Sequence, residues 1–367
     1  MVGGLSPKQA DRYSRHLVLP DIGEEGQLLL LNSSVLVVGA GGLGSPAIAY
    51  LTAAGVGEIG IIDHDVVSVS NLQRQILYSN STVGKPKVES AKIWIEARNE
   101  DVRVNAIEEK MTHDNSLSII QNYDVIIDGT DNFESRYLIG DSCEILGKPW
   151  IFGSVHRFEG QVSTFNLSGG PNYRDLFPES PPPEMAPNCS EAGILGVLPG
   201  LVGTIQATEA IKLILNVGES LRGRLLTIDA SSMDMRTLSF SRNPDRDVVT
   251  NLNAYADQNI LEIVPIDFVE RKQKGWNPFL LDVRREEEEA ITSIDGTEMR
   301  IMHLEIPSKL SQIPSGRDIV VYCRTGVRSA AVARFLIESG KGLGKVYNLS
   351  GGVHGWSDTV DSKIIKY

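Results

Sequence analysis

Two short motifs in this chain carry the residue types that do chemistry. Near the N-terminus, Gly39, Gly41 and Gly44 form a Gly-x-Gly-x-x-Gly turn between a predicted strand and a predicted helix. Near the C-terminus, Cys323 begins a short loop that returns to Arg328. A nucleotide site can activate a carboxylate, and a reactive cysteine can deliver sulfur. Together the motifs predict an enzyme that activates a carboxylate and then transfers sulfur to it.

The glycine-rich turn, which also contains Gly42, is suited to bind phosphate. Glycines let the backbone turn tightly and approach a phosphate, while the helix N-terminus supplies N–H groups and a partial positive charge. Asp63 ends the next predicted strand, where a carboxylate can bind ribose hydroxyls. These features alone fit an NAD-dependent dehydrogenase equally well.

A series of polar residues beyond Asp63 favours nucleotidyl transfer over hydride transfer. The series consists of Asp65, Asn71, Arg74, Gln75, Lys87 and Asp131. Arginine and lysine neutralise a triphosphate and aspartate can hold Mg²⁺, whereas hydride transfer needs fewer polar groups near the phosphates. Taken singly, Arg74 or Lys87 is simply a surface charge. Together with Asp131, they predict binding of ATP and Mg²⁺.

The second motif, Cys323-Arg324-Thr325-Gly326-Val327-Arg328, follows a predicted strand. A loop of this kind directs backbone N–H groups at one centre, which favours a thiolate and holds a small anion. It is one residue shorter than the loop of cysteine-dependent phosphatases and suits a sulfane sulfur. The alternative is a buried structural cysteine, but nothing in packing requires the two arginines and the glycine to cluster.

The elements that must position these motifs alternate between strand and helix. Strands are expected at 34–39, 58–63, 102–107, 124–128 and 150–154, and helices at 42–54, 85–98 and 135–146. This alternation predicts an α/β fold, Rossmann-like, with a mixed, mostly parallel sheet covered on both faces. After a proline-rich loop at 178–189, we expect a long apolar helix at 198–215 and strands at 225–229 and 235–240.

A second, smaller α/β domain is expected after a polar stretch. The predicted domains are 1–242 and 261–367, with a linker at 243–260. In the second domain, strands are expected at 279–284 and 318–323 and a helix at 329–339. Acidic and basic residues balance from Leu261 onward, so the net charge of −12 arises in the first 260 residues.

The first domain resembles the MoeB/ThiF adenylyltransferases, which are relatives of ubiquitin-activating enzymes. The resemblance covers about 5–242 and rests on Arg12 to His16, Gly39 to Gly44, Ser70 to Gln75, Val83 to Ala91 and Asp128 to Asn132. It implies a homodimer that adenylates the C-terminal Gly-Gly carboxylate of a ubiquitin-like sulfur-carrier protein. It also implies roles for single residues: Asp63 for ribose, Asn71, Arg74 and Lys87 for phosphates, Asp131 for Mg²⁺, and Arg15 as an arginine finger reaching the neighbouring subunit.

The sequence departs from this family at one site. The family often carries a structural zinc held by two Cys-x-x-Cys pairs, but the places of the first pair hold Asn172 and Asp175. The second region, 243–249, contains no cysteine. Because tetrahedral structural zinc needs thiolate or imidazole ligands, we expect no zinc here.

The second domain resembles the rhodaneses over about 261–367. Besides the Cys323 loop, the resemblance rests on Asp282-Val283-Arg284 and on the segment Leu349 to Trp356. It implies that Cys323 carries a persulfide, with Arg324 and Arg328 supporting a donor that is either thiosulfate or a cysteine desulfurase. The whole chain thus resembles the fused adenylyltransferase–sulfurtransferases of molybdopterin and thiolation pathways.

The other two cysteines receive different predictions. Cys189 lies in the loop before the long helix, where a helix N-terminus can lower a thiol pKa. The resemblance places it where relatives hold a cysteine that accepts the activated tail or resolves the persulfide; the alternative is a capping or packing role. Cys143, in the helix at 135–146, is expected to pack.

Composition excludes some classes of partner and compartment. The net charge of −12 argues against nucleic acid and membrane surfaces, and no apolar run is expected to reach the roughly 20 residues of a membrane span. Three cysteines are too few for a disulfide framework, which predicts a cytoplasmic protein. A scaffold that binds ubiquitin-like proteins with an inactive nucleotide pocket is the alternative from another class. The complete set of Arg15, Arg74, Lys87 and Asp131 argues against it.

Overall fold

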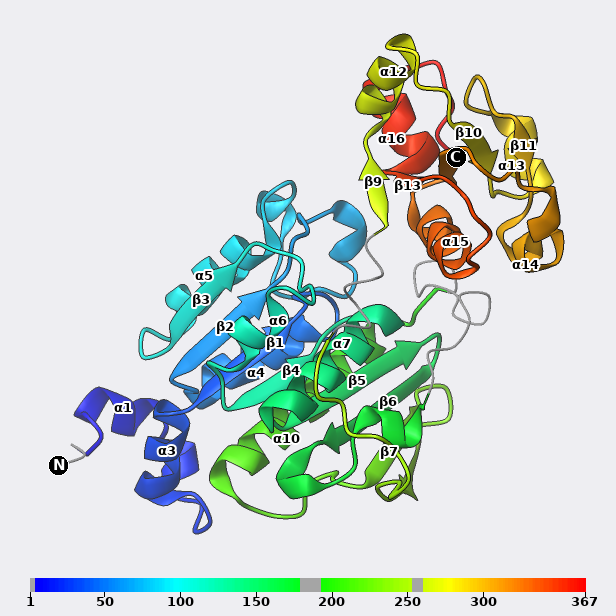
Figure 1. Cartoon of the computed structure of the whole chain (residues 1–367). Coiled ribbons are helices and arrows are strands. Elements are labelled where there is room, and N and C mark those ends of the chain that lie inside the picture. The colour runs from blue at the N-terminus through cyan, green and yellow to red at the C-terminus, as the bar shows by residue number, and fades with distance from the viewer. Residues whose placement is uncertain (1–3, 179–192, 253–259) are drawn as a thin grey trace. The chain divides into compact units, whose positions relative to one another are not determined.

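The computed structural model describes residues 4–178, 193–252 and 260–367. The chain divides into two compact units, with the division after residue 253 (Figure 1). The residue range that the sequence assigned to a linker, 243–260, therefore begins inside the first unit. The exact domain limits remain a prediction.

The first unit is built on an eight-stranded sheet in the order β3-β2-β1-β4-β5-β6-β7-β8. Its first five strands run parallel: β1 Ser34–Val38, β2 Glu58–Ile62, β3 Arg103–Ile107, β4 Val125–Asp128 and β5 Trp150–His156. Three antiparallel strands extend it: β6 Glu159–Phe165, β7 Arg224–Asp229 and β8 Asp234–Ser239. The predicted mixed, mostly parallel sheet is confirmed.

Helices cover both faces of this sheet. Alternate strand residues such as Val35 and Val37 face a core shared with α4 Gly44–Ala54, α5 Lys87–Arg98 and α10 Val197–Leu215. The other face carries an aromatic cluster of Trp150, Phe152, Phe165 and Tyr173. Within the described residues, the other α-helices of this unit are α1 Pro7–Arg12, α2 Ser14–Leu17, α3 Gly23–Leu31, α6 Ser116–Ile120, α7 Phe133–Leu146 and α8 Tyr173–Leu176.

Helix α10 corrects one expectation. With 19 residues it is long and apolar enough to cross a bilayer by length and composition, although no such run was expected. It packs against α4 and against β4, β5 and β6, and it buries Leu198, Val202 and Ala207. A helix that covers the centre of a sheet needs this apolar character for the core alone.

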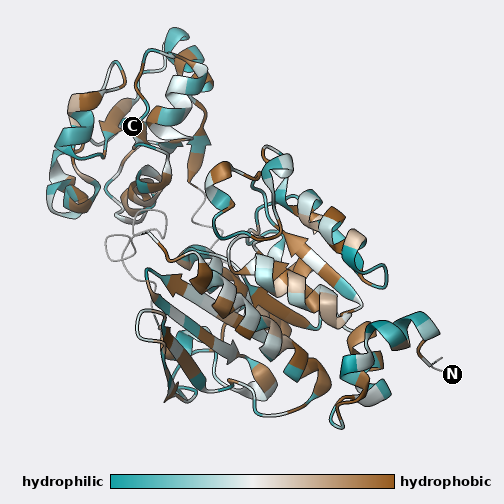
Figure 2. Cartoon of the chain, turned by 180° about the vertical axis from the view of Figure 1, so that it is seen from behind, coloured by the Kyte–Doolittle hydropathy of each residue, from teal (hydrophilic) through white to brown (hydrophobic). Residues whose placement is uncertain are grey.

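The second unit is a five-stranded parallel sheet in the order β11-β10-β12-β13-β9. Its strands are β9 Leu261–Ile263, β10 Phe279–Asp282, β11 Met299–Arg300, β12 Ile319–Tyr322 and β13 Val346–Leu349. From residue 260 onward, its α-helices are α12 Pro265–Gln273, α13 Glu286–Ile291, α14 Ile306–Lys309, α15 Val327–Glu338 and α16 Gly352–Thr359. Figure 2 shows hydrophobic residues concentrated on the central strands of the first unit's sheet, where helices cover them.

Candidate active sites

The glycine-rich turn joins β1 to α4, and close backbone contacts explain its glycines. Gly39 has a φ of +91°, and a Cβ there would lie 2.9 Å from the carbonyl oxygen of Gly129, which follows β4. A Cβ on Gly44 would lie 2.0 Å from the carbonyl oxygen of Gly39. At Gly39 and Gly44 the turn is therefore too tightly closed for a side chain, and it leads directly into the N-terminus of α4.

Asp63, at the end of β2, fixes this turn and also meets Lys87. Its carboxylate accepts hydrogen bonds from the backbone N–H of Ala40 and of Asp65, both at 2.8 Å. The Lys87 ammonium, only 6% exposed, lies 2.7 Å from Asp65 and 3.9 Å from Asp63. Asp63, His64 and Asp65 also come close enough to share a cation, and Lys87 already supplies a positive charge there. The structure thus brings the predicted ribose and phosphate residues beside the turn.

Arg74 and Gln75 lie against the same turn. A Cβ on Gly42 would lie 3.4 Å from Arg74 Cγ, and one on Gly41 would lie 3.7 Å from Gln75 Nε2. The Arg74 guanidinium donates to the carbonyl of Ser70 at 3.1 Å, which restrains its orientation. The side-chain oxygen of Asn71 accepts a hydrogen bond from the backbone N–H of Ser68, which shapes this segment.

Sequence reasoning missed Tyr78 as a member of this site. Its hydroxyl donates to the carbonyl of Ala40 at 2.8 Å, while the N–H of the same residue donates to Asp63, so both side chains fix the glycine-rich turn. Burial, together with the nearby charges of Asp63 and Asp65, raises the pKa of Tyr78, which keeps it a neutral donor. No local motif marks this tyrosine, because its contact is with a residue 38 positions away.

Asp131 is exposed on a turn that follows β4. The turn is held by Asp128, whose carboxylate accepts from the N–H of Thr130 at 2.9 Å and from its hydroxyl at 2.6 Å. Burial raises the pKa of Asp128 to about 6, although Arg136, 3.9 Å away, and Thr130 oppose that change. The buried Asp128 therefore fixes the backbone at Thr130, next to Asp131, and this segment lies against Gly39 through Gly129 and Thr130.

Arg15 is not brought to the other predicted residues within one chain. It lies in α2, and its neighbour Arg12 donates to the carbonyl of Arg98 at the C-terminal end of α5. Lys87 begins the same helix, so the two ends are roughly 17 Å apart at 1.5 Å per residue. Tyr13 likewise packs against Gly55, beyond the end of α4 that is remote from the glycine-rich turn.

In the second unit, Cys323 directly follows β12 and is 1% exposed. Its sulfur accepts hydrogen bonds from the backbone N–H of Gly326 at 3.2 Å and from the hydroxyl of Ser329 at 3.4 Å. Gly326 has a φ of +92° and leads into α15. Thr325 and Val327, the other members of the loop, are exposed. Ser329 was not predicted, although its place one residue past Arg328, on the first turn of α15, could have indicated it.

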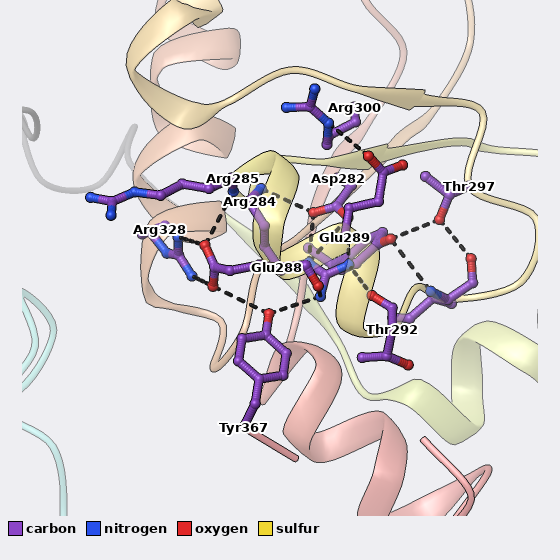
Figure 3. A network of polar contacts seen from close by, with 12 residues as sticks. Asp282, Arg284, Arg285, Glu288, Glu289, Thr292, Thr297, Arg300, Arg328 and Tyr367 are labelled. Carbon is purple, nitrogen blue, oxygen red and sulfur yellow. Dashed lines mark hydrogen bonds and ion pairs between the residues drawn. The ribbon is translucent and has the colours of Figure 1, made fainter. Parts of the chain in front are cut away.

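Arg328 belongs to a polar network with α13 and the last residue of the chain (Figure 3). Its guanidinium donates to both oxygens of Glu288, at 2.6 and 2.7 Å. The hydroxyl of Tyr367 donates to Glu288 at 3.2 Å and accepts from Arg284 at 2.8 Å. Burial alone would raise the pKa of Glu288, but the hydrogen bonds from Arg328 and the N–H of Arg285 bring that pKa to about 2.

Asp282 completes this network. It lies at the end of β10, where it pairs in the sheet with Tyr322, the residue before Cys323. Its carboxylate pairs with Arg284 at 2.6 Å, and both side chains are fully buried. Arg284 also donates to the backbone carbonyls of Glu288 and Thr292. The Asp282-Val283-Arg284 motif therefore holds the middle and the C-terminal end of α13, and Glu288 of this helix binds Arg328. By contrast, Arg324 has no side-chain hydrogen bond or ion pair within residues 4–178, 193–252 and 260–367.

Of the two remaining cysteines, Cys143 lies within the described residues and Cys189 does not. Cys143 in α7 is fully buried, and burial raises its thiol pKa, which agrees with the predicted packing role. Cys189 lies outside the described residues, so its role stays a prediction.

Comparisons with known proteins agree with the division of the chain into two units. The sequence matches the ThiF family over residues 13–248 and the rhodanese-like domain over residues 265–359. It is 41% identical to the probable adenylyltransferase/sulfurtransferase MoeZ of Mycobacterium tuberculosis, over 99% of this chain and 96% of that protein. It is 48% identical to the sulfur carrier protein adenylyltransferase of Thermus thermophilus, over 65% of this chain and 89% of that protein.

Among solved structures, Escherichia coli MccB with ATP matches 66% of this chain and 75% of its own, with a TM-score of 0.56. At 22% identity this similarity establishes the fold alone. It agrees with the Rossmann-like sheet predicted from the sequence.

Proposed function

The chain belongs to the ThiF family, joined to a rhodanese-like domain, and is an adenylyltransferase and sulfurtransferase; from this we propose that it converts the C-terminal Gly-Gly carboxylate of a ubiquitin-like sulfur-carrier protein into a thiocarboxylate. One observation carries the proposal. Each unit contains its own candidate site. The first unit has a glycine-rich turn fixed by Asp63 beside Lys87, and the second has a cysteine with two donors on its sulfur.

In the first step, a carboxylate oxygen of the carrier attacks the α-phosphorus of ATP. The bond between the α-phosphorus and the oxygen that bridges the α- and β-phosphates breaks, giving an acyl-adenylate and pyrophosphate. Lys87, Arg74 and the N–H groups at the start of α4 would balance the phosphate charge. Asp131 would hold Mg²⁺, which neutralises developing charge on the leaving pyrophosphate. Asp63 would accept the ribose hydroxyls.

In the second step, the terminal sulfur of a persulfide on Cys323 attacks the acyl carbon and AMP leaves. The product is an acyl disulfide. A second thiolate, which we assign to Cys189, then attacks the Cys323 sulfur and releases the carrier thiocarboxylate. This leaves a Cys189–Cys323 disulfide that a thiol reductant returns to two thiols. The Gly326 N–H and the Ser329 hydroxyl stabilise the Cys323 thiolate that each cycle regenerates.

The donor that loads Cys323 is thiosulfate or the persulfide of a cysteine desulfurase. Of the two loop arginines, Arg324 presents a cation without a polar partner in the described part of the chain. Arg328 instead holds the loop to α13 through Glu288. We therefore assign contact with the donor to Arg324 and support of the loop to Arg328.

The remote position of Arg15 supports action in a homodimer. Within one chain, α2 lies at the opposite end of α4 and α5 from the glycine-rich turn. An arginine finger at this position has to reach the phosphates of a second copy. This supports the predicted role of Arg15 in trans.

Carrier-dependent ATP–pyrophosphate exchange tests the first step. Wild-type protein with a Gly-Gly-ended carrier is expected to exchange label, and a carrier lacking the last glycine is not. Exchange independent of the carrier, or its complete absence together with binding of NAD in place of ATP, would contradict the proposal. The same assay separates the enzyme from a non-catalytic scaffold.

A further inference from the structure

A buried ion-pair cluster ties the last described segment of the first unit to two of its helices. Arg246 donates from Nε to Asp175 at 2.9 Å, and from its two terminal nitrogens to Glu144 at 3.1 and 2.6 Å. The side chains of Arg246, Glu144 and Asp175 are 12%, 7% and 0% exposed. Glu144 lies in α7 and Asp175 in α8, so one guanidinium joins three separate segments.

The carboxylates of Asp175 and Glu144 also accept hydrogen bonds from groups other than Arg246. Asp175 accepts from the backbone N–H of Asn172 at 2.7 Å and of Asn243 at 3.0 Å, and Glu144 accepts from the amide of Asn172 at 2.9 Å. Burial opposes ionisation of Asp175, but hydrogen bonds from Arg246 and the two N–H groups lower its pKa below the usual value. A buried ion pair is favourable only when its partners are complete in this way.

The cluster lies at the positions where the family resemblance implies a structural zinc. Asn172 and Asp175 are separated by two residues, and Asn243 and Arg246 have the same spacing. Asn172, Asn243 and Arg246 all donate to the carboxylate of Asp175. Structural zinc needs thiolate or imidazole ligands, and here no such group is present among the four, while a guanidinium lies where a cation would be held. These residues do not fit zinc.

We propose that Arg246, with Glu144 and Asp175, is a metal-free clamp that holds residues 243–247 to α7 and α8 and positions the chain for sulfur transfer. Asp175 lies three residues before Pro178, after which the chain continues to Cys189. Arg246 lies six residues before Leu252, which is 7% exposed and after which the chain continues to the second unit. The clamp therefore anchors the chain before the segment that leads to Cys189 and before the segment that leads to the second unit, which carries Cys323. The positioning part rests on the proposed function.

The stability part is tested by Arg246→Ala in the full chain, with Arg236→Ala as the matched control. Arg236 is 77% exposed and pairs with Asp234 at 3.8 Å. Removing Arg246 leaves two buried carboxylates unpaired, so we expect the first unit's Tm to fall by roughly 10 °C, while the control is unchanged. A chelator should not alter the wild-type Tm. Equal Tm values for the two variants, or a chelator-induced fall in wild type, would overturn the clamp.

A quadruple variant tests whether the clamp and a metal site are interchangeable. Asn172→Cys, Asp175→Cys, Asn243→Cys and Arg246→Cys place four thiols where the clamp lies. This variant is expected to bind zinc, to regain most of the Tm lost in Arg246→Ala, and to lose it again when the zinc is chelated. A variant that binds no zinc would overturn the equivalence of the two arrangements.

The positioning part is tested by comparing two rates well below the Tm. Arg246→Ala is expected to keep ATP–pyrophosphate exchange within about twofold of wild type while thiocarboxylate formation falls roughly tenfold or more, since the site near Gly39 is untouched. The zinc-loaded quadruple variant should recover the second rate. A parallel fall of both rates, or no fall in either, would overturn the positioning role. Absence of exchange in wild type would instead remove the proposed function itself.

Discussion

The cysteine loop and the nucleotide site differ in how much of each is assembled within one chain. Around Cys323 the donors to the sulfur are in place, and Arg328 is bound to Glu288. At the nucleotide site Asp63 and Lys87 are buried and paired, but Asp131 is exposed, and Arg15 lies at the far end of α4 and α5. The sulfur donors around Cys323 are thus in place within one chain, whereas the proposed function requires ligands and a second subunit to complete the nucleotide site.

The largest effect is expected from Asp131→Ala. Asp131 is exposed and the turn that carries it is fixed by Asp128, so the variant should fold normally. Without the metal ligand, ATP–pyrophosphate exchange should fall by about 100-fold or more. Wild-type exchange rates in this variant would show that the site is complete without Asp131. Unchanged sulfur loading of Cys323 serves as the internal control.

A complementation experiment tests whether the nucleotide site spans two subunits. Arg15→Ala and Asp131→Ala should each be inactive, but their mixture should regain about a quarter of the wild-type rate. Half of randomly mixed two-fold dimers contain both variants, and each of those has one complete site. Confirmed mixed dimers without recovered activity would place Arg15 in the site of its own chain, against the geometry of α2.

A smaller effect is expected from the network that prepares the cysteine loop. The pKa of Glu288 is about 2 in the folded state, below its ordinary value, so its ion pair stabilises the protein above about pH 4.5 and is lost as the pH falls toward 2. Glu288→Gln should therefore cost about 1 kcal/mol of second-unit stability at pH 7 and progressively less in acid. Calorimetry of the wild-type chain and of the Glu288→Gln chain at pH 7 and pH 3 measures the difference in their stability. A difference that does not change with pH would contradict this account.

Much of the two sites, and of the strands that carry them, could be predicted from local sequence patterns. The glycine-rich turn, Asp63 and the cysteine loop are short motifs at strand ends, and the strands around them are apolar runs that periodicity identifies. The antiparallel strand β6 was not predicted, because its burial follows from pairing with β5 and β7 rather than from a local signal.

Contacts between distant residues could not be predicted in this way. Glu144 and Arg246 are 102 residues apart, and residues 243–247 were assigned to a polar linker because a buried ion pair has the same composition as a solvated loop. Glu288, one of four successive glutamates, and Tyr78 were missed because their partners Arg328 and Ala40 are 40 and 38 residues away. The polar residues that organise these sites become recognisable only when their partners are known.

The central claim, that two chemistries are carried on two units, is tested most directly by Cys323→Ala. The variant removes the proposed persulfide carrier and leaves Gly41, Lys87 and the rest of the nucleotide site unchanged. Incubated with ATP, a Gly-Gly-ended carrier and a sulfur donor, it should adenylate the carrier at the wild-type rate but yield no thiocarboxylate. Mass spectrometry of the carrier detects sulfur in place of oxygen as a gain of about 16 Da. A wild-type rate of this gain without added sulfide would exclude the rhodanese-like unit from the reaction.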